Sequence, residues 1–102
     1  MDFIGWSMGT GRTEWAEWRG DKLLFTIAAQ EVTPDAQAEL WLEAMDSDEL
    51  VIALCAPVRA QQGVVTLILH LPRPGMALRA VGRRDTNLGV IRGLRFEITP
   101  WN

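Results

Sequence analysis

Residues 38–45 read AELWLEAM, and their side chains alternate strictly between two kinds. Successive side chains of a β-strand point to opposite faces, so a strand here would bury one set and expose the other. The set expected inside is Ala38, Leu40, Leu42 and Ala44, and the set expected outside is Glu39, Trp41, Glu43 and Met45. The alternation therefore predicts a strand that turns at the acidic residues 46–49.

The same region also carries helix signals. Thr33 can cap a helix with Pro34 at its first position, and residues 34–49 include no β-branched residue. A helix near 34–45 would give an α+β fold with one helix over a sheet. It would, however, leave Leu40 beside Glu43, whereas a strand buries Leu40. We therefore expect the strand and keep the helix as the alternative.

Short alternating segments continue on both sides of this strand. Strands are expected at Val64 to Leu71, Met76 to Val81 and Val90 to Ile98, with a type II turn at Pro74–Gly75. Leu50 to Ala56 is apolar on both faces, which is typical of a central strand.

Two further segments flank Gly20–Asp21. Thr13 to Arg19 and Lys22 to Glu31 alternate on either side of this turn pair and predict a hairpin. The total is about seven or eight short strands, with turns every 8–14 residues or so. We predict an all-β fold, a jelly-roll-like sandwich of antiparallel sheets.

Composition sets the size and setting of this fold. A chain of 102 residues with 48% hydrophobic and 23% charged residues fits one globular domain covering residues 1–102. The N-terminus lacks the features of a signal peptide, and no apolar run reaches the ~18 residues of a membrane helix. Cys55 is the only cysteine, which is compatible with the reducing cytoplasm where we expect the protein.

Charge is divided unevenly along the chain. Residues 1–50 carry eleven acids and three bases, whereas residues 51–102 carry two acids and seven arginines. This split can be satisfied within one fold, between two copies, or by a partner protein with a basic surface. The net charge of −3 argues against a nucleic-acid partner, because such domains are usually basic.

The outward set of the 38–45 strand is the main candidate binding surface. Seven carboxylates and no Lys or Arg lie between residues 31 and 49. Trp41 would stand between Glu39 and Glu43, and exposed large aromatic residues are enriched at protein interfaces. The alternative is that Trp41 packs under a neighbouring loop and the carboxylates are only solvated.

The acidic turn after this strand is the second candidate. Asp46 and Asp48 offer hard oxygen ligands, but Ca²⁺ takes six to eight oxygens and this turn supplies few of them. We expect no metal and treat both residues as part of the acidic binding surface.

Tryptophan supplies the third candidate. Trp15 and Trp18 are three positions apart, so on a strand only one of them can face the core. An exposed indole beside carboxylates suits the stacking of a sugar ring. A small carbohydrate-binding module is therefore the alternative function. The other interpretation is that the indoles only fill the core and bind nothing.

The arginines of the second half are the basic counterpart of the acidic segment. Arg83 and Arg84 lie in an expected loop, and Arg suits bidentate pairing with carboxylates. Their carboxylate partners are expected in segment 31–49, of the same chain or of a second copy.

Catalysis has little support in the sequence. Cys55 and His70 form the only nucleophile pair available, and both sit in apolar segments where a thiol is inert. No dinucleotide or phosphate-binding loop is complete, so no cofactor is expected. The sequence predicts a non-catalytic protein-interaction module, possibly self-associating, that uses an acidic, Trp-bearing face.

Overall fold

The computed structural model describes residues 9–101, and the expectation about a signal peptide rests mainly on residues before that range. The described chain forms β-strands and no helix, so the all-β prediction is confirmed. The strands are β1 (Gly9–Arg12), β2 (Ala16–Glu17), β3 (Lys22–Ala29), β4 (Glu31–Val32), β5 (Glu39–Met45), β6 (Val51–Ala53), β7 (Val58–Arg59), β8 (Gly63–His70), β9 (Ala77–Arg84), β10 (Ile91–Arg92) and β11 (Arg95–Pro100). Within this range, no helix is long and apolar enough to cross a bilayer.

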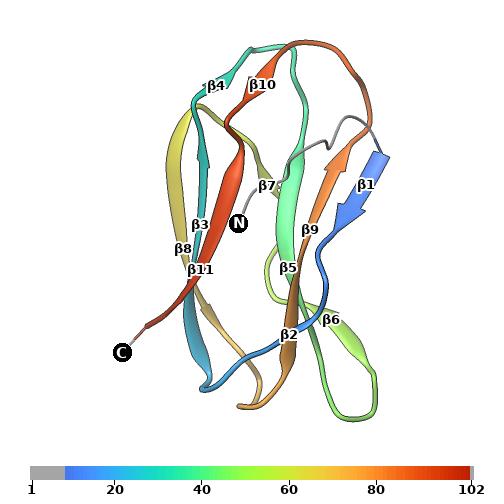
Figure 1. Cartoon of the computed structure of the whole chain (residues 1–102), viewed down its shortest axis with the longest axis vertical. Helices are drawn as coiled ribbons and strands as arrows, with labels where there is room; N and C mark the ends of the chain where they lie inside the picture. The colour runs from blue at the N-terminus through green and yellow to red at the C-terminus, as the bar shows by residue number, and fades with distance from the viewer. Residues whose placement is uncertain (1–8, 102) are drawn as a thin grey trace.

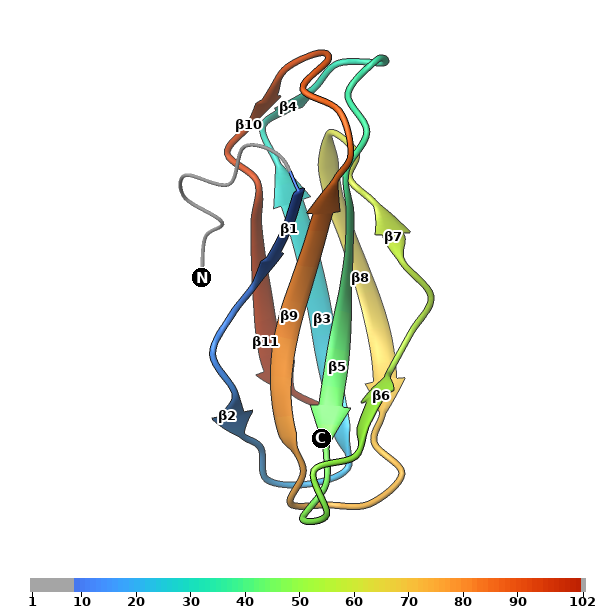
Figure 2. The same cartoon turned by 90° about the vertical axis from the view of Figure 1, so that its right-hand side faces the viewer.

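Two antiparallel sheets pack face to face, as Figures 1 and 2 show. The larger sheet has the order β1-β9-β5-β6, with β2 also paired to β9 and β7 to β5. The smaller sheet has the order β11-β3-β8, and the ribbon β10-β4 lies at one end of the sandwich. The long strands alternate between the two sheets along the chain, so β3 pairs with β8 in the smaller sheet and β5 pairs with β9 in the larger one.

β5 confirms the strand prediction for residues 38–45 and rules out the helix alternative. Its burial alternates, with Leu40, Leu42 and Ala44 fully buried between the sheets. Glu39, Trp41, Glu43 and Met45 are half-buried on the outer face of the larger sheet. The pattern prevails over helix propensity because only a strand buries both leucines.

The core fills the space between the two sheets. β3 contributes Leu23, Phe25 and Ile27, and the Phe25 ring meets Phe96 of β11 edge-on with centroids 6.2 Å apart. β8 and β11 add Leu69 and Phe96, which are both buried.

Two details of the predicted connectivity are wrong. Residues 13–19 and 22–31 do not form a hairpin: β2 pairs with β9 in one sheet, and β3 pairs with β8 and β11 in the other. Gly20 does turn the chain, with a φ of 90°, but this turn carries it from one sheet to the other.

Residues 50–56 are not a central strand. Only Val51–Ala53 form β6, which lies at the edge of the larger sheet with exposed residues throughout. An apolar segment was expected to have a strand on each side, but β6 has only β5 as a neighbour.

A close approach of two loops closes the end of the sandwich near β4 and β10. Thr33 Oγ1 accepts a hydrogen bond from the N–H of Val90 at 2.8 Å and donates to Asp35 Oδ1 at 2.7 Å. Gly89 has a φ of +75°, and a Cβ there would lie 2.4 Å from Thr33 Oγ1. Gly75, in the predicted Pro74–Gly75 turn, has a φ of +82° with nothing within 4 Å of a Cβ.

Candidate functional site

The outer face of the larger sheet places β5 and β9 side chains opposite one another. In the observed register Glu39 lies opposite Arg83, Trp41 opposite Val81, and Glu43 opposite Arg79. Directly opposed residues on one face of an antiparallel pair are close enough to interact. The predicted outward residues of β5 are therefore brought together on one surface with arginines from the second half of the chain.

These arginines neutralise the two carboxylates that were expected to face a partner. Arg79 Nη2 lies 2.8 Å from Glu43 Oε1, and Arg83 Nη2 lies 2.9 Å from Glu39 Oε1. The hydrogen bond to Glu39, and then its negative charge, raise the pKa of Arg83 above the ordinary value.

The uneven charge is matched in part within the chain itself. Two further carboxylates of segment 31–49 pair with later arginines, Glu31 with Arg92 and Asp46 with Arg73. Pairing within one chain therefore accounts for four of the seven carboxylates of segment 31–49. Little unpaired negative charge is therefore left on segment 31–49.

Each of these β9 arginines also lies against an indole ring. The guanidinium carbon of Arg79 is 4.3 Å from the centre of the Trp15 ring, and that of Arg83 is 5.5 Å from the centre of the Trp41 ring. Both distances are within the range of cation–π attraction. Val81 points outward between them yet is only 1% exposed, so these long side chains shield the strand beneath them.

We call this set the tryptophan–arginine surface. It consists of Trp15, Glu39, Trp41, Glu43, Arg79 and Arg83. Both indoles are half-buried, neither sunk in the core nor fully free. Trp18, by contrast, packs against the core, as expected of one member of the Trp15–Trp18 pair.

Asp46 holds the turn between β5 and β6. Its Oδ1 accepts hydrogen bonds from the N–H groups of Leu50 at 3.0 Å and Asp48 at 2.9 Å, and its Oδ2 accepts one from Arg73. The N–H of Leu50 is the largest influence that lowers the pKa of Asp46, and the N–H of Asp48 and the charge of Arg73 lower it further. Both carboxylate oxygens of Asp46 are thus used to shape the turn, whereas Asp48 stands exposed at its tip.

Arg83 and Arg84 were expected in a loop, but they are the last two residues of β9, and the Arg84 side chain binds the loop that follows. This side chain donates hydrogen bonds to the carbonyl oxygens of Thr86, Leu88 and Gly89, at 3.1, 3.2 and 3.3 Å. These bonds hold the loop that follows β9. Arg84 therefore lies apart from the pairing of Arg83 with Glu39, although the two residues adjoin in sequence.

An exposed apolar row at the β6 end was missed by the sequence reasoning. Leu50 is 63% exposed and Val51 is 45% exposed. Val51 of β6 lies opposite Met45 of β5, and Met45 lies opposite Ala77 of β9. Ala77 in turn lies opposite Glu17 of β2, where the apolar row ends. A signal was available in Pro57, because a proline close after an apolar segment limits it to a short or edge strand.

The remaining candidates, Cys55 and His70, lie at or just after the ends of strands that belong to different sheets. Cys55 is half-buried just after β6 in the larger sheet, and His70 ends β8 in the smaller sheet, with its ring 6.4 Å from that of Trp101. No hydrogen bond joins Cys55 and His70, both of which the structure describes. Across residues 9–101, no group of three or more His, Cys, Asp or Glu side chains is placed to hold a metal ion.

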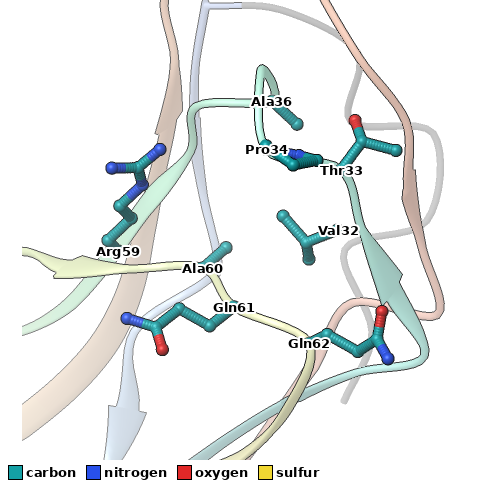
Figure 3. Close-up of a pocket in the computed structure, with 8 residues that line it drawn as sticks. All are labelled: Val32, Thr33, Pro34, Ala36, Arg59, Ala60, Gln61 and Gln62. Carbon is teal, nitrogen blue, oxygen red and sulfur yellow. The ribbon is translucent and has the colours of Figure 1, made fainter.

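A pocket of about 300 Å³ lies at the end of the sandwich, and Figure 3 shows the residues that line it. Its lining combines Val32, Pro34 and Ala60 with two glutamine amides, and Arg59 is its one charged residue. The one hydroxyl of the lining, that of Thr33, donates a hydrogen bond to Asp35 and accepts one from the N–H of Val90.

Comparison with known proteins adds no relative. No protein-family model, curated protein or solved structure matches this chain. The class of protein is therefore given by the fold, an all-β sandwich, and by the paired and apolar surfaces of its larger sheet.

Proposed function

We propose that the chain is a non-catalytic protein-interaction module whose partner docks on the outer face of the larger sheet. The observation that carries this proposal is the exposed apolar row at the β6 end, where Leu50 and Val51 adjoin the half-buried Met45. Exposed apolar patches with a polar rim mark interaction sites, and Trp, Met and Arg are enriched at interfaces. The tryptophan–arginine surface continues this row along β5.

The partner's expected chemistry is apolar at its centre and basic at its rim. Asp48, Glu49 and Glu17 border the apolar row, and no ion pair involves them within the described range. Such exposed charges chiefly guide the encounter and set its specificity, and salt screens them over a Debye length of about 8 Å. The apolar row would then supply most of the affinity.

A carbohydrate ligand has less support on the same surface. A sugar ring needs a free indole face and free hydrogen-bonding groups, but the Trp15 and Trp41 rings already lie against guanidinium groups. Glu39 and Glu43 already accept hydrogen bonds from arginine. A cytoplasmic location is part of the proposal, since a lone half-buried Cys55 suits a reducing compartment.

The test compares two matched substitutions on the full-length tagged chain. Val51→Lys places a charge in the apolar row, whereas Leu88→Lys makes a similar change at an exposed residue of the loop after β9. We expect a protein captured from an extract of the source cells to be retained by the wild type and by Leu88→Lys, and lost from Val51→Lys.

Two outcomes would contradict the proposal. One is equal retention by both variants, and the other is capture of no protein at low salt. Quenching of tryptophan fluorescence by a glycan panel, with no protein captured, would instead favour the carbohydrate-binding alternative.

A further inference from the structure

β8 is a long strand with one unpaired edge. Its eight residues pair with β3 on one side, and no other described strand pairs with it. Hydrogen-bonded and non-hydrogen-bonded residue pairs alternate along an antiparallel ladder. The N–H of Leu71 donates to the carbonyl oxygen of Asp21 at 2.8 Å, one step beyond the pair of Lys22 with His70.

That bond fixes the direction of every backbone group on β8. Leu69, Leu67 and Val65 lie at two-residue steps from Leu71, so they exchange hydrogen bonds with β3. The residues between them direct their N–H and C=O groups away from β3. These residues are Val64, Thr66, Ile68 and His70.

The edge of β8 lacks the features that protect natural edge strands. Residues 63–70 include no Lys, Arg, Asp, Glu or Pro, and their register with β3 runs without a bulge. Val64 is 68% exposed and Ile68 is 52% exposed. The opposite arrangement is seen at β6 and β7, which are edge strands of three and two residues.

We propose that β8 pairs with β8 of a second copy, antiparallel, about a twofold axis at Thr66. Twofold symmetry makes two identical strands antiparallel, and the outward backbone groups must meet one another. Centring the axis on Thr66 places Val64 opposite Ile68 of the second copy twice, and Thr66 opposite itself. Centring it on Leu67 would instead place Val64 opposite His70 and Thr66 opposite Ile68.

The absence of charge on the strand favours a second copy as the occupant. No like charges would be opposed along the paired strands, and such opposition destabilises a strand pair. The two smaller sheets would then join into one continuous sheet, with the order β11-β3-β8 in one copy and β8-β3-β11 in the second. This inference does not depend on the proposed function, which uses the outer face of the other sheet.

The first measurement is the mass of the full chain by light scattering over a wide range of concentration. We expect the mass to rise from that of one chain toward that of two, with little effect of salt, because the contact is apolar and backbone-mediated. Ile68→Lys should hold the chain monomeric, whereas Leu88→Lys should associate as the wild type does. Thr66→Pro should also prevent association, because it removes an outward N–H that β3 does not use.

A cross-link tests the register. In a Cys55→Ala background, Thr66→Cys would place two thiols on directly opposed residues, whose Cα atoms are about 5.5 Å apart, within disulfide range. Val64→Cys on the same strand would separate the thiols by four residues, about 13 Å. We expect Thr66→Cys alone to give a disulfide-linked dimer under mild oxidation.

A chain that stays monomeric at every concentration would overturn the proposal. So would a dimer unaffected by Ile68→Lys, or equal cross-linking of Val64→Cys and Thr66→Cys. If Thr66→Pro fails to fold, Ile68→Lys and the cross-link still decide, because both alter an exposed edge. Loss of dimerisation with Ile68→Lys would leave partner capture at Val51 unchanged if both proposals hold.

Discussion

Replacing Leu42 by alanine should remove a large part of the stability of this domain. Leu42 is fully buried in the middle of β5, with β9 on one side of the strand and β6 on the other. Losing three carbon groups from the core costs about 2.4 kcal/mol at about 0.8 kcal/mol each. A residual void of a few tens of Å³ adds about 1 kcal/mol, so we expect a loss of about 3–4 kcal/mol.

That loss is large against a total stability of about 5–15 kcal/mol for a chain of this length. The assay is urea unfolding followed by tryptophan fluorescence, with the midpoint expected to fall and the slope to stay constant. Leu50→Ala is the matched control, since Leu50 is 63% exposed and its truncation should cost about 0.5 kcal/mol or less. Leu40→Ala should resemble Leu42→Ala. Equal effects of Leu42→Ala and Leu50→Ala would refute the burial of one face of β5.

Three further results are expected. The pKa of Asp46 is lowered in the folded state, so its ionised carboxylate stabilises the fold at pH values above its ordinary pKa of 3.8. This contribution is lost as the pH falls through the lower folded-state pKa. Asp46→Asn should therefore weaken the dependence of stability on pH, measured by urea unfolding between about pH 2 and 5. Arg79→Lys keeps the charge but loses the planar group over Trp15, so it should cost about 0.5–1 kcal/mol and increase quenching of Trp15 by acrylamide, with unchanged quenching counting against the stacking. Gly89→Ala should destabilise the domain by more than about 2 kcal/mol, because the new Cβ adds a clash with Thr33 to the strain of a positive φ. Gly75→Ala should cost about 1 kcal/mol, because it adds the strain alone. Similar urea midpoints for the two variants would contradict the contact between the loops.

The sequence was informative wherever one local pattern decided the structure. AELWLEAM has a period of two that only a strand satisfies, so the buried and outward sets of β5 could be predicted residue by residue. β8 followed for the same reason, whereas the single strand expected from Val90 to Ile98 is divided near Gly93 into β10 and β11, which lie in different sheets. The Pro74–Gly75 turn was predictable because a type II turn needs a positive φ at its second central residue.

Pairing between strands was not accessible in the same way. An apolar segment such as 50–56 shows no alternation, and so it does not reveal whether a strand lies on one side or on both. Gly20–Asp21 marks a turn in the chain, but the residues of a turn do not say whether the next strand joins the same sheet. Both errors concern contacts between segments, which local periodicity does not encode.

The same distinction between local pattern and contacts of distant segments applies to the candidate site. The outward direction of Glu39, Trp41 and Glu43 followed from alternation, and their arginine partners did not, because these lie about forty residues further along the chain. The exposed row at Leu50 and Val51 was missed because its segment was expected to be buried on both sides.

The charge split between the two halves is better explained as a device that fixes the register of β5 against β9. In the observed register both carboxylates face arginines, Glu39 with Arg83 and Glu43 with Arg79. A slip of two residues one way would place Glu39 opposite Val81, and a slip the other way would place it opposite Asp85, a like charge. A slip of one residue would turn the buried leucines of β5 outward. Since both kinds of slip lose stability, the carboxylates of β5 and the arginines of β9 fix the pairing of the two strands within one chain. Under the proposed function, the apolar row and the few unpaired carboxylates would then recognise the partner.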